Sequence, residues 1–346
     1  MKGYNPIELA EKLRPKMIDL KNKKVLLAVL AGTEQQKDLT KERFFESIFR
    51  SKIYTKPEDK ELDPFRGEPA GIAAKKLNVT PDECNAAFLG QINGCNLNCW
   101  YCYVDRVCNS ANPKYGRYFS AEEYLKQFLV EKRKNQDSPN LDLRLNILRI
   151  SGGEVFIVPE IIVWMVQALE EFKLEDYIYV WVDCNLVTGD FYWKYLTAKQ
   201  REKIRNFKNL GVCVCHKGFD RQTFHENTRA APEFFDEQFK LHRRLIDEGL
   251  DVYSYLYPVT ISTDNLRKRI ATFMDKLREE VSEYAPLRMA TPPIKVYGPT
   301  KKRLTPEREK ALENQWKAME IWKEELQKRY TPEELSLKPH EVPVRK

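Results

Sequence analysis

From about residue 86 onward, short apolar stretches alternate with longer stretches whose apolar residues repeat at helical spacing. Strands are expected at 87–91, 145–151, 178–184, 212–216 and 252–257, with 287–290 as a further candidate. The helices expected between them are 120–131, 159–172, 198–206, 232–248 and 265–284. Strands that alternate with helices in this way predict an α/β fold in which helices cover a parallel sheet.

The residues on either side of this alternation are expected to form extensions. Residues 1–85 begin with a helical pattern and include a charged, proline-bearing stretch at 56–65. Near the other end, Thr305 is placed to cap a long helix that runs to about Arg329. On that helix Trp316, Met319 and Trp322 repeat at helical spacing, which predicts packing. The chain therefore divides into residues 1–85, 86–295 and 296–346.

Composition and charge exclude few classes of protein. They do indicate the cellular compartment in which the chain is expected. Lys and Arg outnumber Asp and Glu by 58 to 51, a net charge of +7, which is too mild to indicate nucleic acid by itself. The longest apolar run, residues 25–31, is far shorter than a membrane span. The first residues lack the apolar core of a signal peptide. With eight cysteines, three of them on one short stretch, the expectation is a cytoplasmic protein with reduced thiols.

One short stretch carries three cysteines, Cys95, Cys99 and Cys102, with three and two residues between them. Thiolates at this spacing can bind three irons of a cuboidal 4Fe–4S cluster, which normally takes four cysteines. The fourth iron would then be open to a ligand. Gly94 is expected to let the backbone pass close to inorganic sulfur. If Cys108 joined the three, a structural zinc site or a ferredoxin-like cluster would be the alternative.

A second motif follows about fifty residues later, where the expected strand 145–151 ends in Gly152, Gly153 and Glu154. Paired glycines at a strand end allow a ligand to approach bare backbone. The carboxylate of Glu154 can accept a charge-assisted hydrogen bond from an amine. The alternative is an ordinary turn between a strand and a helix.

The cysteine run, with Tyr101 directly before its last cysteine, resembles the Cys-x3-Cys-x-aromatic-Cys signature of the radical S-adenosylmethionine (radical SAM) superfamily. The second motif is similar to that family's Gly-Gly-Glu motif, and the resemblance covers roughly residues 86–260. It implies a partial, TIM-type (β/α)6 barrel with one 4Fe–4S cluster. It further implies an enzyme that cleaves S-adenosylmethionine reductively to a 5′-deoxyadenosyl radical, which abstracts hydrogen from a substrate. An electron donor such as ferredoxin or flavodoxin would be a partner.

The resemblance also implies roles for residues around the cofactor. Gly152, Gly153 and Glu154 would bind its methionyl amine, and Tyr101 would contribute backbone contacts or packing near the adenine. Asn185, in preference to Asp183, would hydrogen-bond the ribose hydroxyls. The alternative is that these residues are only a polar cap at the end of a strand. Lys217 would pair with the methionyl carboxylate or a substrate anion, or is simply a solvated lysine after a strand. The stretch around Lys217 is similar to the branch of the family that contains radical-enzyme activases.

Five cysteines remain outside the motif, and no cysteine follows Cys215, which argues against a second cluster. They are expected to serve as small apolar residues: Cys84, Cys108, Cys184, Cys213 and Cys215. The substrate stays open between a small molecule and a peptide. Alternatives are an activase that installs a glycyl radical on a partner enzyme, an RNA-modifying enzyme, and a non-enzymatic iron–sulfur electron carrier.

Overall fold

A mostly parallel sheet forms the centre of the computed structural model, which describes residues 2–39, 43–53, 69–136 and 144–345. Its spine runs in the order β1-β2-β5-β7-β8-β9-β10-β11. The six strands from β5 onward pair in parallel along this spine. They are β5 (Ala86–Ile92), β7 (Leu145–Gly152), β8 (Tyr179–Cys184), β9 (Leu210–His216), β10 (Val252–Leu256) and β11 (Met289–Ala290). The predicted strands are confirmed, except that residues 285–288 form a 3-10 turn before β11.

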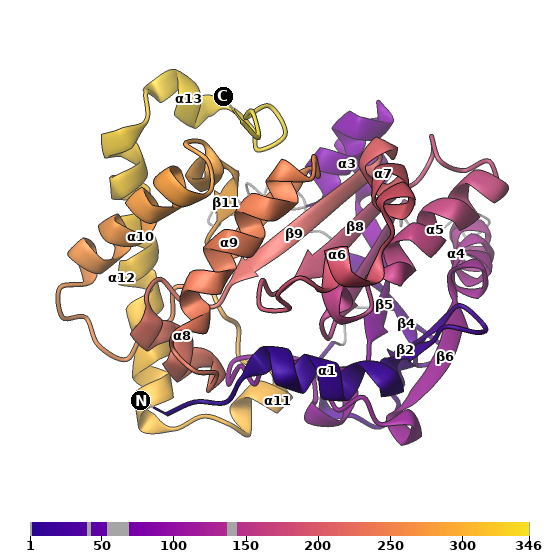
Figure 1. Cartoon of the computed structure of the whole chain (residues 1–346), viewed down its shortest axis with the longest axis horizontal. Coiled ribbons are helices and arrows are strands. Elements are labelled where there is room, and N and C mark those ends of the chain that lie inside the picture. The colour runs from indigo at the N-terminus through magenta and orange to yellow at the C-terminus, as the bar shows by residue number, and fades with distance from the viewer. Residues whose placement is uncertain (1, 40–42, 54–68, 137–143, 346) are drawn as a thin grey trace.

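Helices follow the strands and cover one face of the sheet (Figure 1). They are α4 (Ala121–Gln136), α5 (Glu160–Glu171), α6 (Phe191–Tyr195), α7 (Ala198–Asn206), α8 (Arg221–Thr228), α9 (Phe234–Asp247) and α10 (Leu266–Glu280). A capping box starts α4, since Ser120 N donates to the Glu123 carboxylate (2.7 Å) and Glu123 N donates to the Ser120 hydroxyl (3.1 Å). The predicted α/β class is confirmed, and the arrangement is consistent with a partial barrel.

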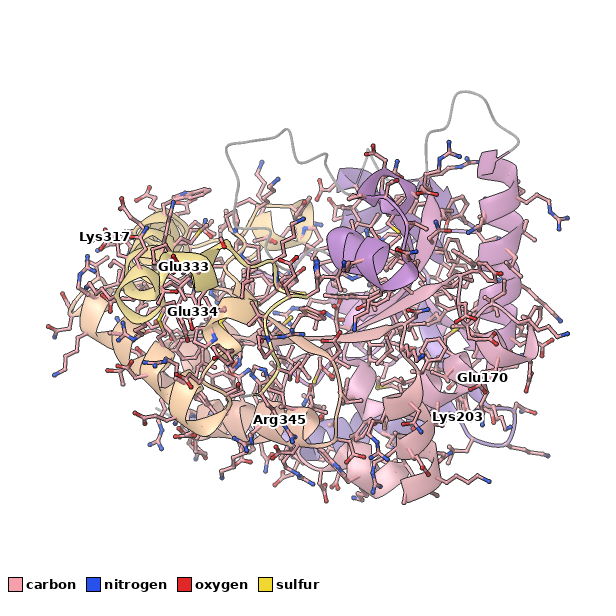
Figure 2. All side chains as sticks on the ribbon, turned by 90° about the horizontal axis from the view of Figure 1, so that it is seen from above. Glu170, Lys203, Lys317, Glu333, Glu334 and Arg345 are labelled. Atoms are coloured by element: carbon pink, nitrogen blue, oxygen red, sulfur yellow. The ribbon has the colours of Figure 1, made fainter. Side chains whose placement is uncertain are left out.

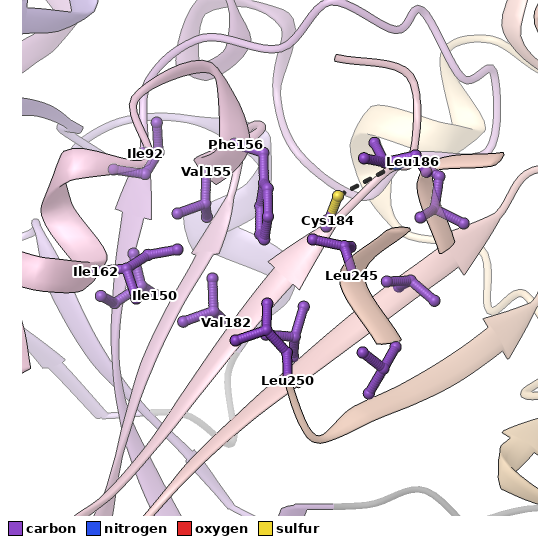
Figure 3. Packing of buried hydrophobic residues seen from close by; sticks show 14 of the residues in the cluster. Ile92, Ile150, Val155, Phe156, Ile162, Val182, Cys184, Leu186, Leu245 and Leu250 are labelled. Atoms are coloured by element: carbon purple, nitrogen blue, oxygen red, sulfur yellow. Dashed lines mark hydrogen bonds between the residues drawn. The ribbon is translucent and has the colours of Figure 1, made fainter. Parts of the chain in front are cut away.

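The two faces of the parallel strands are buried against different partners. Figure 3 shows Ile150 and Val182 on the helix-covered face, beside Ile162 of α5 and Leu245 of α9. On the inner face, side chains such as Trp181 pack with α3 (Pro69–Leu77) in a separate apolar cluster. Strands buried on both faces explain why their sequences are nearly continuous apolar runs.

Residues before β5 extend the same sheet with antiparallel strands, which the sequence did not predict. They are β1 (Ile18–Asp19), β2 (Lys24–Ala28), β3 (Arg43–Phe45) and β4 (Phe49–Ile53), and β6 (Gly116–Ser120) joins them from after β5. β4 pairs with β5 along its length, and β2 pairs with both β5 and β6. The helical start is confirmed as α1 (Pro6–Met17), and a short α2 (Glu34–Asp38) follows β2. The charged stretch at 56–65 lies outside the described residues. The sheet therefore continues across the predicted boundary at residue 86, because strands on both sides of it pair with one another.

The C-terminal extension is helical, as expected. It contains α11 (Gly298–Lys301), α12 (Pro306–Arg329) and α13 (Pro332–Ser336), with Thr305 capping α12. Trp322 is buried and Met319 half-buried, but Trp316 is 54% exposed. The expectation that Trp316 packs is wrong, because its side chain lies on the side of α12 that faces solvent.

Ion pairs tie neighbouring elements together at the surface. In Figure 2, Glu170 of α5 and Lys203 of α7 lie side by side and pair. Arg345 pairs with Asp247 at 2.8 Å, which fastens the chain end to α9. Within the described ranges, no helix is both long and apolar enough to pass through a membrane.

Two buried histidines between β9 and α9 should make the fold sensitive to acid. His216 Nε2 and His242 Nδ1 lie 3.2 Å apart. Burial lowers the pKa of both, that of His242 to about 3. The unfolded chain therefore binds protons below pH 6.5 that the folded chain excludes, so stability falls with falling pH. For His242 alone the loss between pH 6.5 and 5 is roughly 2 kcal/mol. Denaturant unfolding of cluster-free protein should show a weaker pH dependence in His242→Gln; parallel profiles would contradict this.

Candidate functional site

The two sequence motifs lie side by side at the carboxyl ends of β5 and β7. These strands pair in parallel with Ile92 opposite Gly152. The backbone pairing continues past the strand ends, since Gly153 N donates to Ile92 O (2.9 Å) and Glu154 N to Gly94 O (2.8 Å). Functional groups in such sheets collect at this edge. The Gly-Gly-Glu segment is therefore bonded directly to the start of the cysteine loop.

The glycines allow this close contact between the two segments. A Cβ on Gly153 would overlap the carbonyl oxygen of Gly94 and lie 2.6 Å from that of Ile92. Gly152 has a φ of +97°, and a Cβ there would overlap the side chain of Gln91. Their bare Cα positions face protein, so both glycines are required for the cysteine loop to approach β7. Contact of their backbone with a ligand stays a prediction.

Gly94 also packs closely against another segment. Its φ is +140°, and a Cβ would meet the side chain of Met17, with Cε at 2.8 Å. The missing side chain makes room for Met17 at the end of α1, and a close approach of inorganic sulfur stays a prediction. Gly94 sets the direction in which the loop leaves β5.

Two of the three thiols of the loop receive hydrogen bonds suited to thiolate ligands. Leu97 N lies 3.5 Å and Asn185 Nδ2 3.9 Å from Cys95 Sγ, and Asn109 Nδ2 lies 3.9 Å from Cys102 Sγ. Donors to sulfur of this kind accompany iron–sulfur clusters and tune them. Cys99 is buried, and the other two are half-buried.

The thiols do not converge on one point. Among the residues that the structure describes, no three His, Cys, Asp or Glu side chains form a group that could hold a metal ion. In a cuboidal cluster each thiolate binds a different iron, so convergence is not required. The donor set therefore fits a three-cysteine cluster better than the zinc alternative.

Burial raises the pKa of two of the loop thiols and favours their protonated form before metal is bound. It raises the pKa of Cys99 to about 11, although the positive charge of Lys217 lowers it, and it also raises the pKa of Cys95. Because only the thiolate ligates iron, metal binding must release these protons.

Glu154 joins the ends of two neighbouring strands. Its Oε1 accepts from Phe156 N (2.9 Å), and its Oε2 accepts from Asn185 N (2.7 Å). Burial raises the pKa of this carboxyl to about 8, while the two backbone donors oppose the shift. Each carboxylate oxygen retains a further lone pair, so binding of an amine by Glu154 stays a prediction.

Asn185 connects β8 to the cysteine loop. Its Nδ2 donates to Asn96 Oδ1 (2.7 Å), and its Oδ1 accepts from Val187 N (3.0 Å). Both ends of its amide are thus engaged within the protein, and the ribose contact stays a prediction. Asp183 accepts from Arg149 (2.9 Å) and from Trp181 Nε1 (3.0 Å), so its carboxylate is also engaged.

Lys217 and Tyr101 present polar groups that lack protein partners. The ammonium of Lys217 lies 5.0 Å from the ring centre of Tyr257, and no carboxylate pairs with it in the described part of the chain. Burial acts to lower its pKa, but Cys215, Tyr101 and Cys99 hold that pKa above its usual range. The buried hydroxyl of Tyr101 likewise has no hydrogen-bond partner among the described residues. A cation and a hydroxyl beside the loop fit a ligand that carries a carboxylate and further polar groups.

Residues outside the predicted core hold the loop in place, and the sequence analysis missed them. Arg303 donates to the carbonyl oxygens of Cys99 (2.9 Å) and Cys102, and Thr300 donates to that of Tyr101 (3.2 Å). From the N-terminal side, Tyr4 OH donates to Asn96 O (3.1 Å). α1 and α11 lie along the edge toward which β8 and β9 point (Figure 1). No local pattern marks these residues, because their partners are distant in the chain.

Arg303 offers a direct test of this support. Arg303→Ala removes charged donors from two ligand carbonyls, and such hydrogen bonds are each worth ~1.5–3 kcal/mol. We expect reconstituted protein to lose iron to a chelator about tenfold faster. Arg133→Ala, an exposed arginine on α4, is the matched control and should behave as wild type. Equal rates of iron loss in the two variants would show that the extension does not support the loop.

The other five cysteines are buried, as expected. Figure 3 shows Cys184 on the helix-covered face, where its sulfur accepts from Leu186 N (3.3 Å). Cys108 packs with Ala28 and Leu30 in a small apolar cluster. The remaining three belong to the inner cluster against α3: Cys84, Cys213 and Cys215.

A model of the radical SAM superfamily matches residues 91–274, which include the cysteine loop and the Gly-Gly-Glu segment. The chain belongs to the radical SAM superfamily. It is therefore an enzyme, and membership implies a 4Fe–4S cluster and S-adenosylmethionine as cofactors. The electron-carrier alternative is set aside.

Solved structures with similarity to this radical SAM enzyme are distant. Streptococcus suis SuiB bound to S-adenosylmethionine is 16% identical, with a TM-score of 0.38 over 66% of this chain and 45% of that chain. SuiB bound to its precursor peptide SuiA gives the same identity and TM-score over 61% and 40%. TYW1 with a lysine–pyruvate adduct is 13% identical, with a TM-score of 0.44 over 73% and 91%. The chain spans less than half of SuiB, and no curated protein sequence matches it.

Proposed function

We propose that Cys95, Cys99 and Cys102 hold a single 4Fe–4S cluster and that S-adenosylmethionine binds beside it, against the Gly-Gly-Glu segment. The observation that carries the proposal is the hydrogen bonding of Gly153 and Glu154 to the start of the cysteine loop. This bonding holds the cofactor motif next to the cluster ligands. When bound, cluster and cofactor supply a one-electron reductive cleavage that starts hydrogen abstraction from the substrate.

The protein's own groups would orient the cofactor. The backbone at Gly152 and Gly153 and the free lone pairs of Glu154 would take the methionyl amine. Lys217 would take the methionyl carboxylate or an anionic group of the substrate, which its unpaired ammonium supports. The unpartnered hydroxyl of Tyr101 supports a place for this residue near the adenine. Asn185 would hold Cys95 and Asn96 in position at the ribose side.

A single cluster is supported by the distribution of the other cysteines. Cys184 faces the outer helices, Cys108 packs in an apolar cluster, and Cys213 and Cys215 lie on the inner face of β9. Cys84 packs with Cys213 and Cys215 among apolar side chains against α3, as expected of cysteines that serve as small apolar residues.

The substrate that we propose is a small molecule or a peptide. Contacts from both extensions to the cysteine loop, through Tyr4, Thr300 and Arg303, support a site that the extensions help to enclose. We infer accordingly that residues 1–85 and 296–346 serve the barrel of 86–295. An activase role on a glycyl-radical enzyme rests on the resemblance around Lys217 alone, and RNA modification rests on the mild positive charge and the aromatic content.

Cleavage of S-adenosylmethionine tests the proposal. With dithionite and without oxygen, reconstituted wild type should form 5′-deoxyadenosine and methionine slowly, even when no substrate is added. The variant with all three loop cysteines changed to Ala should form neither product. Wild type that holds its cluster, is reduced, and yields no 5′-deoxyadenosine with any candidate substrate would contradict the proposal.

A further inference from the structure

Four arginine side chains gather around the cysteine loop. Arg106 begins the short helical turn four residues after Cys102, and Arg229 ends α8. Arg303 and Arg308 come from the C-terminal extension. The first two are exposed, and the second two are half-buried.

Arg308 lies at the centre of the four, because its guanidinium donates to the carbonyl oxygen of Arg303. Burial lowers the pKa of Arg308, and the nearby positive charges of Arg229 and Arg106 lower it further. Burial likewise lowers the pKa of Arg303, and Arg106 adds to this effect. Arg308 lies 5.6 Å from the ring centre of Trp100, inside the cysteine loop. We call these four residues the arginine patch.

The arginine patch carries an excess of positive charge. Asp105 acts on Arg303 and Glu307 acts on Arg308, but within the described ranges none of the four guanidinium groups forms an ion pair with a carboxylate. Arginines elsewhere do so, for example in the pairs Arg269–Asp220 (2.6 Å) and Arg329–Asp275 (2.7 Å). Like charges in excess of their counter-charges create a positive local field. Such a surface suits an anionic partner.

We propose that the arginine patch is the docking surface for a small acidic protein that carries a low-potential flavin or iron–sulfur centre. This inference rests on the proposed function, in which each cleavage of S-adenosylmethionine requires one electron from outside the chain. In the transfer, the reduced centre of the partner loses one electron and the cluster gains it. No covalent bond forms or breaks in that step.

The position of the arginine patch favours an electron donor over other anionic partners. Arg303 touches the carbonyl oxygens of two cluster ligands, and Asn98 at the loop tip is exposed. A partner seated there would be separated from the cluster by little protein. Opposite charges on the two surfaces would steer the encounter and orient the complex. A nucleic acid fits less well, because Trp100 beneath Arg308 is buried and not available to stack on a base.

Cluster reduction by two different donors tests the docking surface. The holoenzyme is mixed without oxygen with reduced flavodoxin or with reduced methyl viologen, and bleaching of the cluster is followed by stopped flow. In Arg106→Glu/Arg229→Glu the ratio of the flavodoxin rate to the viologen rate should fall about tenfold or more at low ionic strength. The strong salt dependence of the wild-type flavodoxin rate should largely disappear. Arg303 and Arg308 are left intact because they hold the loop.

Matched single reversals provide the control. Arg106→Glu should lower the ratio of rates, whereas Arg133→Glu should leave it unchanged. Arg133 lies on α4 next to Lys132, and Lys132 contacts Asn146 at the start of β7. The cysteine loop lies at the opposite, carboxyl end of β7. Equal ratios in wild type and the double variant would overturn the docking proposal alone. The docking proposal would also be overturned if the double variant kept the wild-type ratio of rates but no longer bound an RNA oligonucleotide. Viologen-reduced wild type that yields no 5′-deoxyadenosine would instead overturn the proposed function.

Discussion

Protein in which Cys95, Cys99 and Cys102 are all changed to Ala should hold essentially no iron after anaerobic reconstitution. Wild type should hold close to four irons per chain and absorb broadly near ~400 nm, as thiolate–iron clusters do. The physical reason is that the loop supplies all the protein ligands of the proposed cluster. Iron analysis and the absorption spectrum of the two proteins measure the effect.

Cys108→Ala is the matched control for this loss. Cys108 lies on the same stretch of chain but packs with Ala28 and Leu30 in an apolar cluster. Its variant should therefore keep the iron content and the spectrum of wild type. Stoichiometric zinc without iron uptake in wild type, or loss of iron in Cys108→Ala, would refute the ligand assignment.

Gly153→Ala should abolish tight binding of S-adenosylmethionine. The added methyl group would overlap Gly94 O and crowd Ile92 O, and both neighbours are backbone atoms that cannot move aside alone. Overpacking costs ~1–3 kcal/mol, and the two hydrogen bonds that join the segments are worth ~1 kcal/mol each. A total of roughly 3 kcal/mol corresponds to ~100-fold weaker binding. Equilibrium dialysis with reconstituted protein gives the affinity.

Gly71→Ala separates this local effect from the general effect of replacing glycine. Gly71 lies in α3, and nothing would stand within 4 Å of an added Cβ. Alanine in a helix is more stable than glycine by ~0.5–1 kcal/mol, so this variant should bind the cofactor as wild type does. If Gly153→Ala binds equally well, the cofactor site does not depend on contact between the two motifs.

Local sequence patterns predicted the elements that carry the site. The strands β5 and β7 are runs of apolar residues, and both motifs follow them directly, so their meeting at one sheet edge could be predicted. The antiparallel strands β2 and β4 were missed because their pairing partners lie far along the chain. The same holds for Arg303, whose contacts with the cysteine loop span about two hundred residues.

Some residues lie where they were predicted but make protein contacts that the sequence did not predict. Gly94 and Gly153 are required for packing against Met17 and against the cysteine loop. Asn185 lies at the expected strand end, and its amide is engaged by Asn96 and Val187. A sequence identifies positions where side chains are small or polar, but the partner that each position meets depends on the assembled fold.

The spectrum of the reduced cluster tests the central claim most directly. An electron paramagnetic resonance spectrum is recorded from dithionite-reduced, reconstituted wild type with and without S-adenosylmethionine. If three cysteines hold the cluster and the cofactor binds the open iron, the g values should change when the cofactor is added. The change should be lost in Gly153→Ala at a cofactor concentration that saturates wild type. An identical spectrum with and without saturating cofactor in wild type would contradict the account.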